Sequence, residues 1–144
     1  MVDIHIAYEG ELRCVAKHGP SGIELFTDAP VDNHGKGQSF SPTDLVATAL
    51  GTCMMTVMGI YAAKHGIDLA GSRVHVKKVM TKAPPRRIAE LPSEILVPRE
   101  KAERIDEAAR RALVEIAETC PVRLSLLPAI ALPLVVQWGE QPQT

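Results

Sequence analysis

Residues 41–63 read SPTDLVATALGTCMMTVMGIYAA, and this stretch predicts the longest helix of the chain. Ser41 is a suitable N-cap, Pro42 suits the first helical position, and Asp44 stands where the acid of a capping box belongs. Gly66 is a typical C-cap glycine, so the helix is expected to end just before it. The nineteen residues that follow Asp44 carry no charge. We therefore expect this helix to lie inside the molecule.

An uncharged run of this length also meets the length requirement of a membrane span. Polar and small residues make it only mildly apolar on insertion scales: Thr48, Gly51, Thr52, Thr56 and Gly59. Strand-like sequence flanks it on both sides, and no second run of this kind follows. A buried helix of a globular protein is the interpretation that we prefer, with no membrane as a partner.

The remaining sequence predicts strands and one further long helix around this segment. Before it, alternating apolar residues predict an antiparallel meander of strands at residues 2–8, 12–17 and 23–27, followed by a polar loop at 28–40. After it come strands at 72–82 and 88–97, a helix at 99–119, a short segment at 122–127 and a last strand at 130–138. Antiparallel sheets with two long helices indicate an α+β fold, and we expect one domain over residues 1–144.

Composition excludes several classes of function. The 144 residues carry a net charge of −1 and only 3% aromatic residues, which disfavours nucleic acid as a partner. The basic stretch at 77–87 is balanced by Glu90 and Glu94 and is interpreted as a solvated hairpin. No export signal is recognisable at the start, so three cysteines suggest a reducing compartment, and we expect a cytoplasmic protein.

Two of the cysteines lie on apolar helical faces. Cys53 shares one face with Val46, Ala49, Leu50, Val57, Ile60 and Tyr61, and this spacing predicts that it points inward. Cys120 continues the apolar stripe of the second helix. Free cysteines often only fill space in a core, and that is how we interpret Cys14. Two inward thiols on separate helices can meet only if those helices meet.

The residues after Cys120 favour a reactive thiol. Pro121 ends the preceding helix and can start the next one, which makes Cys120 its N-cap. A helix N-terminus stabilises a thiolate, and Arg123 adds a cation one turn on. Local sequence therefore predicts that Cys120 is the thiol with the lower pKa.

Metal and cofactor motifs are missing from the sequence. Zinc sites usually contain closely spaced ligand pairs, and the five histidines are scattered without such pairs. No phosphate-binding glycine loop, nucleophile elbow or zinc-protease motif occurs either. We expect a protein that uses no metal and no cofactor.

Two motifs resemble those of the OsmC/Ohr family. The first is Ser41-Pro42-Thr43-Asp44-Leu45 with the following Ala47, Ala49, Leu50, Gly51 and Cys53, which is similar to the central-helix motif of that family. The second is Cys120-Pro121-Val122 with Ser125 and Leu126, which is similar to its second cysteine motif. The order of elements matches over nearly the whole chain.

The resemblance implies an intertwined α+β homodimer, with antiparallel sheets packed around two long central helices and active sites at the interface. It implies reduction of organic hydroperoxides, and sometimes of hydrogen peroxide. By this resemblance Cys53 is the peroxidatic thiol, which becomes a sulfenic acid, and Cys120 is the resolving thiol, which forms a disulfide with it. A dithiol donor then reduces the disulfide.

The chain departs from the family at two positions. Members that reduce organic hydroperoxides use an arginine from an early Gly-Gly-Arg turn, where this chain reads KHGPSG at residues 17–22. They also use a glutamate where Thr43 stands here. Arg13 and Arg123 are the candidates for the missing cation. Asp44, beside Thr43, is the candidate for the missing carboxylate, although it lies roughly 13 Å along the helix from Cys53.

Two other functions remain open at this stage. The chain could be a non-catalytic protein that binds an apolar ligand in the dimer cleft, for which Met54, Met55 and Met58 would provide an adaptable surface. It could also exchange disulfides without acting on hydroperoxides. Replacement of Cys53 by serine distinguishes the enzyme from the binding protein, because only the enzyme depends on that thiol.

Overall fold

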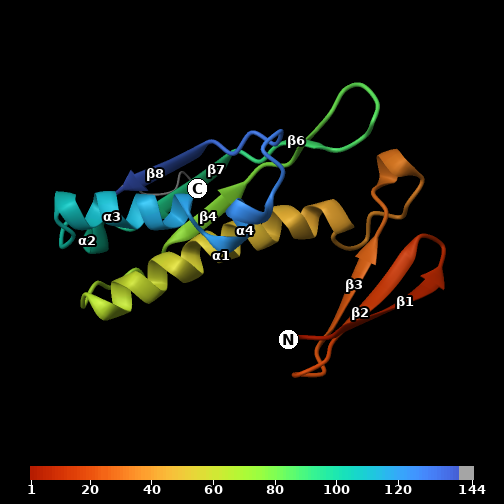
Figure 1. Cartoon of the computed structure of the whole chain (residues 1–144), viewed down its shortest axis with the longest axis horizontal. Coiled ribbons are helices and arrows are strands. Elements are labelled where there is room, and N and C mark those ends of the chain that lie inside the picture. Colours follow the sequence, from red (N-terminus) through yellow and green to blue (C-terminus); the bar gives the residue numbers. More distant parts are fainter. Residues whose placement is uncertain (140–144) are drawn as a thin grey trace. The chain divides into compact units, whose positions relative to one another are not determined.

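A computed structural model describes residues 1–139 and confirms the α+β class. Figure 1 shows the elements in chain order. Contacts divide the chain into two compact units, one that ends at Val46 and one that starts at Ala47. The long helix α1, Pro42–Lys64, begins in the first unit and continues through the second. The single domain expected over the whole chain stays a prediction.

The first unit is the predicted antiparallel meander of β1 (Ile4–Gly10), β2 (Arg13–His18) and β3 (Glu24–Asp28). The first strand runs to Gly10, two residues beyond its predicted end, and the turn that follows lies at Glu11 and Leu12. Both residues have positive φ, as the two-residue turns of tight hairpins require. In the polar loop, a short 3-10 helix spans Val31–Asn33. Gly35 is required there, because a Cβ would lie 1.8 Å from the carbonyl oxygen of Ala29.

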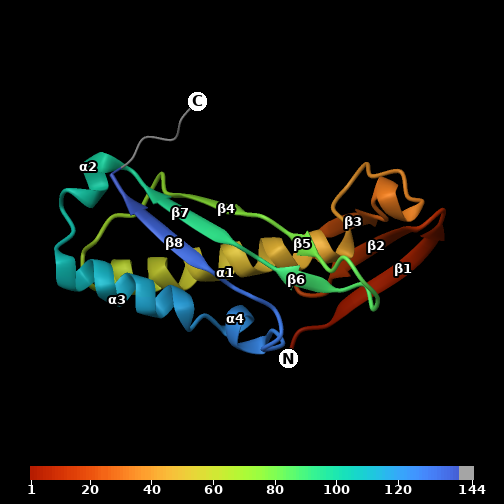
Figure 2. The same cartoon turned by 90° about the horizontal axis from the view of Figure 1, so that it is seen from above.

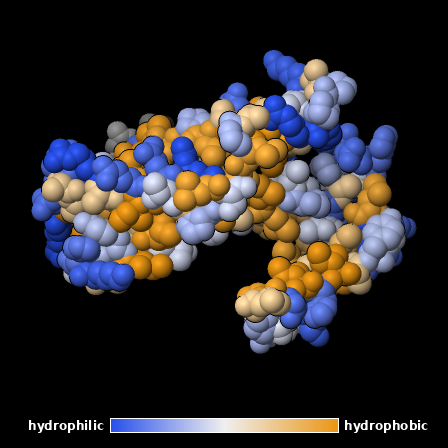
Figure 3. Space-filling view, viewed as in Figure 1, coloured by the Kyte–Doolittle hydropathy of each residue, from blue (hydrophilic) through white to orange (hydrophobic). Residues whose placement is uncertain are grey.

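This first unit has little apolar core of its own. Its buried residues among those described are Thr27, Asp28 and Ser41, all of them polar. By contrast, the outward positions of the sheet carry large apolar side chains, and 61–68% of each of Ile4, Ile6 and Tyr8 is exposed. These three alternate along β1 and so share one face of the sheet. Hydrophobic surface is visible on this unit in Figure 3.

The start of α1 is the predicted capping box. The Asp44 carboxylate accepts a hydrogen bond from the Ser41 backbone N–H at 2.7 Å, and the Asp44 N–H donates to the Ser41 hydroxyl at 3.2 Å. Pro42 is the first helical residue, as predicted. At the other end, Gly66 has a φ of 67° and ends the helix. Reciprocal bonds of this kind satisfy two backbone donors that the first turn leaves unpaired.

The second unit contains a three-stranded sheet in the order β4-β7-β8 and a separate pair, β5-β6. Its strands are β4 (Arg73–Val76), β5 (Val79–Met80), β6 (Ile88–Glu90), β7 (Ser93–Val97) and β8 (Leu134–Trp138). Lys77 and Lys78 divide the predicted strand 72–82 into β4 and β5. The described pairings between strands are antiparallel except that of β7 with β8, which is parallel.

The second predicted long helix is divided into two. Residues 99–119 form α2 (Arg99–Ala102) and α3 (Glu107–Glu118), and a short α4 (Pro121–Ser125) follows. The prediction of one continuous helix is therefore wrong. Asp106 is the reason, because its backbone is extended and its side chain accepts a hydrogen bond from the Ala109 N–H, so it caps a new helix.

Helix α1 packs under the sheet, as Figure 2 shows. Gly51 faces β4 closely, because a Cβ there would lie 3.0 Å from Val76 and 3.3 Å from Val74. The core of the second unit is built around this contact and includes Leu50, Met54, Met58, Leu91, Ile95, Val97, Leu113, Ala117 and Cys120, each at most 1% exposed. By length and composition α1 could also cross a membrane, and 33% of its most apolar 18-residue stretch is buried inside the molecule.

Candidate active site

Cys53 lies in the middle of α1, at the border of its buried face. The buried stripe of the helix consists of Ala47, Leu50, Gly51, Met54, Met58 and Ala62. Threonines 48, 52 and 56 lie exposed on the other side. Cys53 is half-buried between these two faces. The buried face of α1 therefore lies one residue further along the chain than predicted. As a result, the Cys53 thiol is partly exposed and not enclosed in the core.

Cys120 stands at the N-terminus of α4, as the sequence predicted. It is the N-cap of that helix, and its Sγ accepts a hydrogen bond from the Arg123 backbone N–H at 3.4 Å. Pro121 occupies the first turn. Unlike Cys53, Cys120 is a core residue, with 1% of its surface exposed.

The side chains of Cys120 and Cys53 lie close enough to interact. Burial, the largest influence, raises the pKa of the Cys120 thiol, and a hydrogen bond and charge interaction with Cys53 raise it further. Backbone N–H groups of Arg123 and Val122 act in the opposite direction. The balance of these influences raises the pKa of Cys120.

The prediction of an acidic Cys120 is wrong, because the pKa of this thiol is raised. The helix N-terminus on which the prediction relied is present, and its backbone donors do lower the pKa. Their effect is outweighed because removing the thiol from water penalises its charged form more than two backbone bonds stabilise it. A raised pKa at Cys120 is consistent with the resolving role that the resemblance assigns to it.

Arg123, a candidate for the activating cation, follows Cys120 by three residues in the chain. Within residues 1–139 its Nη1 is buried and lacks a hydrogen-bond partner. Side chains in a helix lean toward the N-terminus, so that of Arg123 leans toward the turn capped by Cys120. A buried guanidinium nitrogen without an acceptor is costly, so this nitrogen would gain from an acceptor that residues 1–139 do not supply.

Arg13, the other candidate, belongs to the first unit and is already paired. Its guanidinium binds Asp28 through two bonds, Nε to Oδ1 at 2.8 Å and Nη2 to Oδ2 at 3.0 Å. This contact holds the pKa of Asp28 below and that of Arg13 above its usual value. Nη2 also donates to the Gln38 side chain at 3.3 Å. The structure thus gives Arg13 a structural partner that sequence reasoning missed.

Asp44 and Thr43 lie at the capped start of α1. The Asp44 carboxylate is engaged by the Ser41 backbone N–H, and the hydroxyls of Thr43 and Ser41 are 3.1 Å apart. These contacts give both residues a role in helix capping.

The methionines that suggested an adaptable cleft divide between core and surface. Met54 and Met58 are fully buried, and Met55 is half-buried. Cys14 is half-buried in β2, opposite Tyr8 and Thr27. No group of three or more metal-ligating side chains gathers within residues 1–139.

Comparison with known proteins identifies relatives over most of the chain. The family model described as OsmC-like protein matches residues 35–134. A solved structure from Psychrobacter arcticus 273-4, named for an osmotic stress and detoxification response, is 42% identical to this chain. It has a TM-score of 0.87, and the match covers 95% of this chain and 96% of that one.

More distant structures share the fold. The organic hydroperoxide resistance protein OsmC from Legionella pneumophila is 16% identical with a TM-score of 0.72, over 94% of this chain and 96% of that one. The organic hydroperoxide resistance protein OhrB of Bacillus subtilis is 15% identical with a TM-score of 0.67, over 95% and 98%. No curated protein sequence matches the chain.

Proposed function

This chain belongs to the OsmC-like protein family, and on that premise we propose that it reduces organic hydroperoxides through Cys53 and Cys120. The observation that carries the proposal is the closeness of the two thiols, of which Cys53 is half-buried and Cys120 is buried. The names of two relatives, which refer to organic hydroperoxide resistance, support a role in peroxide chemistry.

The first step takes place at Cys53. Its thiolate attacks the outer oxygen of the hydroperoxide, an S–O bond forms and the O–O bond breaks. The leaving alkoxide takes up a proton and departs as the alcohol, and Cys53 becomes a sulfenic acid. Cys53 suits this role because it is half-buried and more accessible than the buried Cys120.

The second step takes place at Cys120. Its sulfur attacks the Cys53 sulfenic acid, an S–S bond forms, and the hydroxyl leaves as water. The closeness of the two side chains reduces the rearrangement that is needed before this step. A dithiol donor then exchanges with the disulfide, returns both cysteines to thiols and is itself oxidised to a disulfide. The balance of both steps requires no metal or cofactor.

A coupled turnover assay tests this proposal. Purified protein receives cumene hydroperoxide with dithiothreitol as the dithiol donor, and the alcohol product is measured over time. We expect multiple turnovers for the unchanged protein and for Cys14→Ser, which serves as the matched cysteine control. Absence of turnover, or turnover that survives Cys53→Ser, contradicts the proposal.

We also propose that the protein acts as a cytoplasmic homodimer. Support comes from the row of apolar side chains exposed on β1, because an exposed apolar patch often marks an interface. Sedimentation tests the assembly, with a dimer expected for the unchanged protein. Ile6→Glu, at the centre of the exposed row on β1, is expected to shift it toward the monomer, and a monomeric unchanged protein contradicts the proposal.

A further inference from the structure

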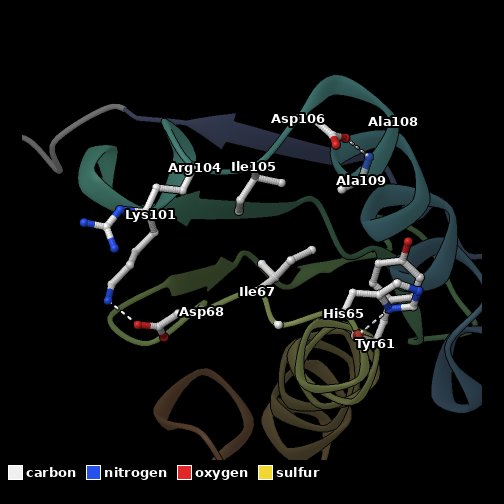
Figure 4. A pocket seen from close by; sticks show the side chains of 11 residues that line it. Tyr61, His65, Ile67, Asp68, Lys101, Arg104, Ile105, Asp106, Ala108 and Ala109 are labelled. Atoms are coloured by element: carbon white, nitrogen blue, oxygen red, sulfur yellow. Dashed lines mark hydrogen bonds and ion pairs between the residues drawn. The ribbon is translucent and has the colours of Figure 1, made fainter.

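A cavity of about 510 Å³ lies in the second unit, between the end of α1 and the segment that joins α2 to α3 (Figure 4). Its size falls in the range of roughly 300–1,000 Å³ that is usual for small-molecule sites. None of its eleven lining residues is a cysteine. Tyr61, one of them, follows Cys53 by about 12 Å along the helix axis. The cavity is therefore separate from the thiol pair.

One side of the cavity is an aromatic wall. The rings of Tyr61 and His65 are stacked, with centroids 3.9 Å apart and an angle of 21° between their planes. Nδ1 of His65 lies 2.8 Å from the carbonyl oxygen of Tyr61, and because a carbonyl only accepts, this nitrogen donates. The bond fixes the imidazole ring in place. A planar ligand would thus meet a wall that is already ordered.

The other side carries two cations and one carboxylate, as Figure 4 shows. Lys101 forms an ion pair with Asp68. That bond, together with the Ala70 backbone N–H and the charges of Lys101 and Arg104, holds the pKa of Asp68 below its usual range. Among the described residues, no acceptor hydrogen-bonds the Arg104 guanidinium. Its planar set of donors is available to an anion.

The remaining acid of the cavity is directed elsewhere. Asp106 accepts a hydrogen bond from the Ala109 N–H at 2.8 Å, and Figure 4 shows this carboxylate turned toward the start of α3. There its charge is balanced by the positive end of the helix dipole. Between the aromatic wall and the cations lie Ile67 and Ile105, which give the cavity an apolar middle.

We propose that this cavity binds a small aromatic carboxylate. The carboxylate binds Arg104 and Lys101, because a guanidinium fork matches the two oxygens of a carboxylate. The ring lies between the two isoleucines with its far end against Tyr61, where an offset or edge contact between aromatic rings is favourable. The site is independent of the peroxide chemistry proposed above, so either can fail without the other.

Calorimetric titration of the full chain with benzoate tests the site, and neutral benzamide serves as the probe of equal shape without charge. We expect saturable binding of benzoate and at least tenfold weaker binding of benzamide. Arg104→Gln should weaken benzoate about tenfold. Arg99→Gln is the matched control, because Arg99 is exposed, pairs with Glu103 and does not line the cavity.

Backbone amide shifts measured by NMR during the same titration locate the ligand. Shifts that saturate in residues 61–68 and 101–109 support the site, and shifts confined to other segments overturn it. Absence of saturable benzoate binding overturns it as well, as does equal binding of benzamide or an equal loss of affinity in Arg99→Gln. Circular dichroism confirms that the variants fold, which is expected because both arginines are exposed.

Discussion

The regions that carry Cys53 and Cys120 differ in their access to solvent. In the middle of α1, Cys53 is half-buried beside a row of exposed threonines. At the start of α4, Cys120 is 1% exposed, and burial raises its pKa although the helix N-terminus donates two hydrogen bonds to it. The difference teaches that a helix N-terminus alone does not make a thiol acidic, because the free energy of desolvation has to be included.

The sharpest way to break this comparison is to remove the accessible thiol. Cys53→Ser is expected to lower the rate of hydroperoxide reduction by roughly three orders of magnitude or more, because no other described thiol is both accessible and paired. Stopped-flow measurement of peroxide consumption checks it. Cys14→Ser should retain the full rate. An equal loss in both variants would show that the effect arises from folding and not from chemistry.

Removing the buried thiol should separate the two chemical steps. In Cys120→Ser the first oxidation is expected to proceed and then stop, because the sulfenic acid has no neighbouring thiol to condense with. Turnover with a dithiol donor should fall about a hundredfold, a size that follows from losing the preorganised partner. Trapping with dimedone and mass spectrometry should find the label on Cys53. Continued rapid turnover would contradict the resolving role.

Replacing Arg123, whose buried Nη1 lacks a partner within residues 1–139, should have a smaller effect. Arg123→Met keeps most of the side-chain volume and removes the charge, and we expect about a tenfold loss in the rate of Cys53 oxidation if the guanidinium binds the peroxide or the thiolate. Arg111→Met is the control. Arg111 is exposed on α3, and its Nη1 lies 3.7 Å from Oε1 of the exposed Glu107. Equal rates in the two variants would exclude Arg123 from the site.

The pH dependence of stability should distinguish the two regions most finely. A thiol whose pKa is raised on folding contributes stability that is present below its unfolded pKa, about 8.5, and is lost as pH rises through the folded value. Urea unfolding of the reduced protein between neutral and alkaline pH should therefore show a decline in stability. Cys120→Ala is expected to flatten this decline and Cys14→Ala is not. An unchanged decline in Cys120→Ala would contradict a buried, neutral Cys120.

Sequence predicted those features that local chemistry determines. The capping box of Ser41 and Asp44 needs only residues three positions apart, and the N-cap role of Cys120 follows from Pro121. The face of α1 that carries Cys53 was predicted one residue off. The threonines at 48, 52 and 56 give this uncharged helix only a weak directional signal, and the packing of Gly51 against β4 identifies the buried stripe.

Other features depend on tertiary structure and were beyond sequence reasoning. The sign of the pKa shift at Cys120 follows from its burial in the core, which no local pattern reveals. Likewise, the bidentate pair of Arg13 and Asp28 joins neighbouring strands whose register the sequence does not give. The division of the second helix did have a local signal, because Asp106 followed by Glu107 is a typical helix start.

Peptide mapping tests most simply whether Cys53 and Cys120 form a disulfide when a hydroperoxide oxidises the protein. The reduced protein is treated with one equivalent of cumene hydroperoxide, denatured, alkylated and digested, and its cross-linked peptides are identified by mass. We expect one disulfide between Cys53 and Cys120 and a free, alkylated Cys14. If all three thiols are oxidised as slowly as in the unfolded protein, or if a disulfide involves Cys14, the proposed reaction of Cys53 with Cys120 is contradicted.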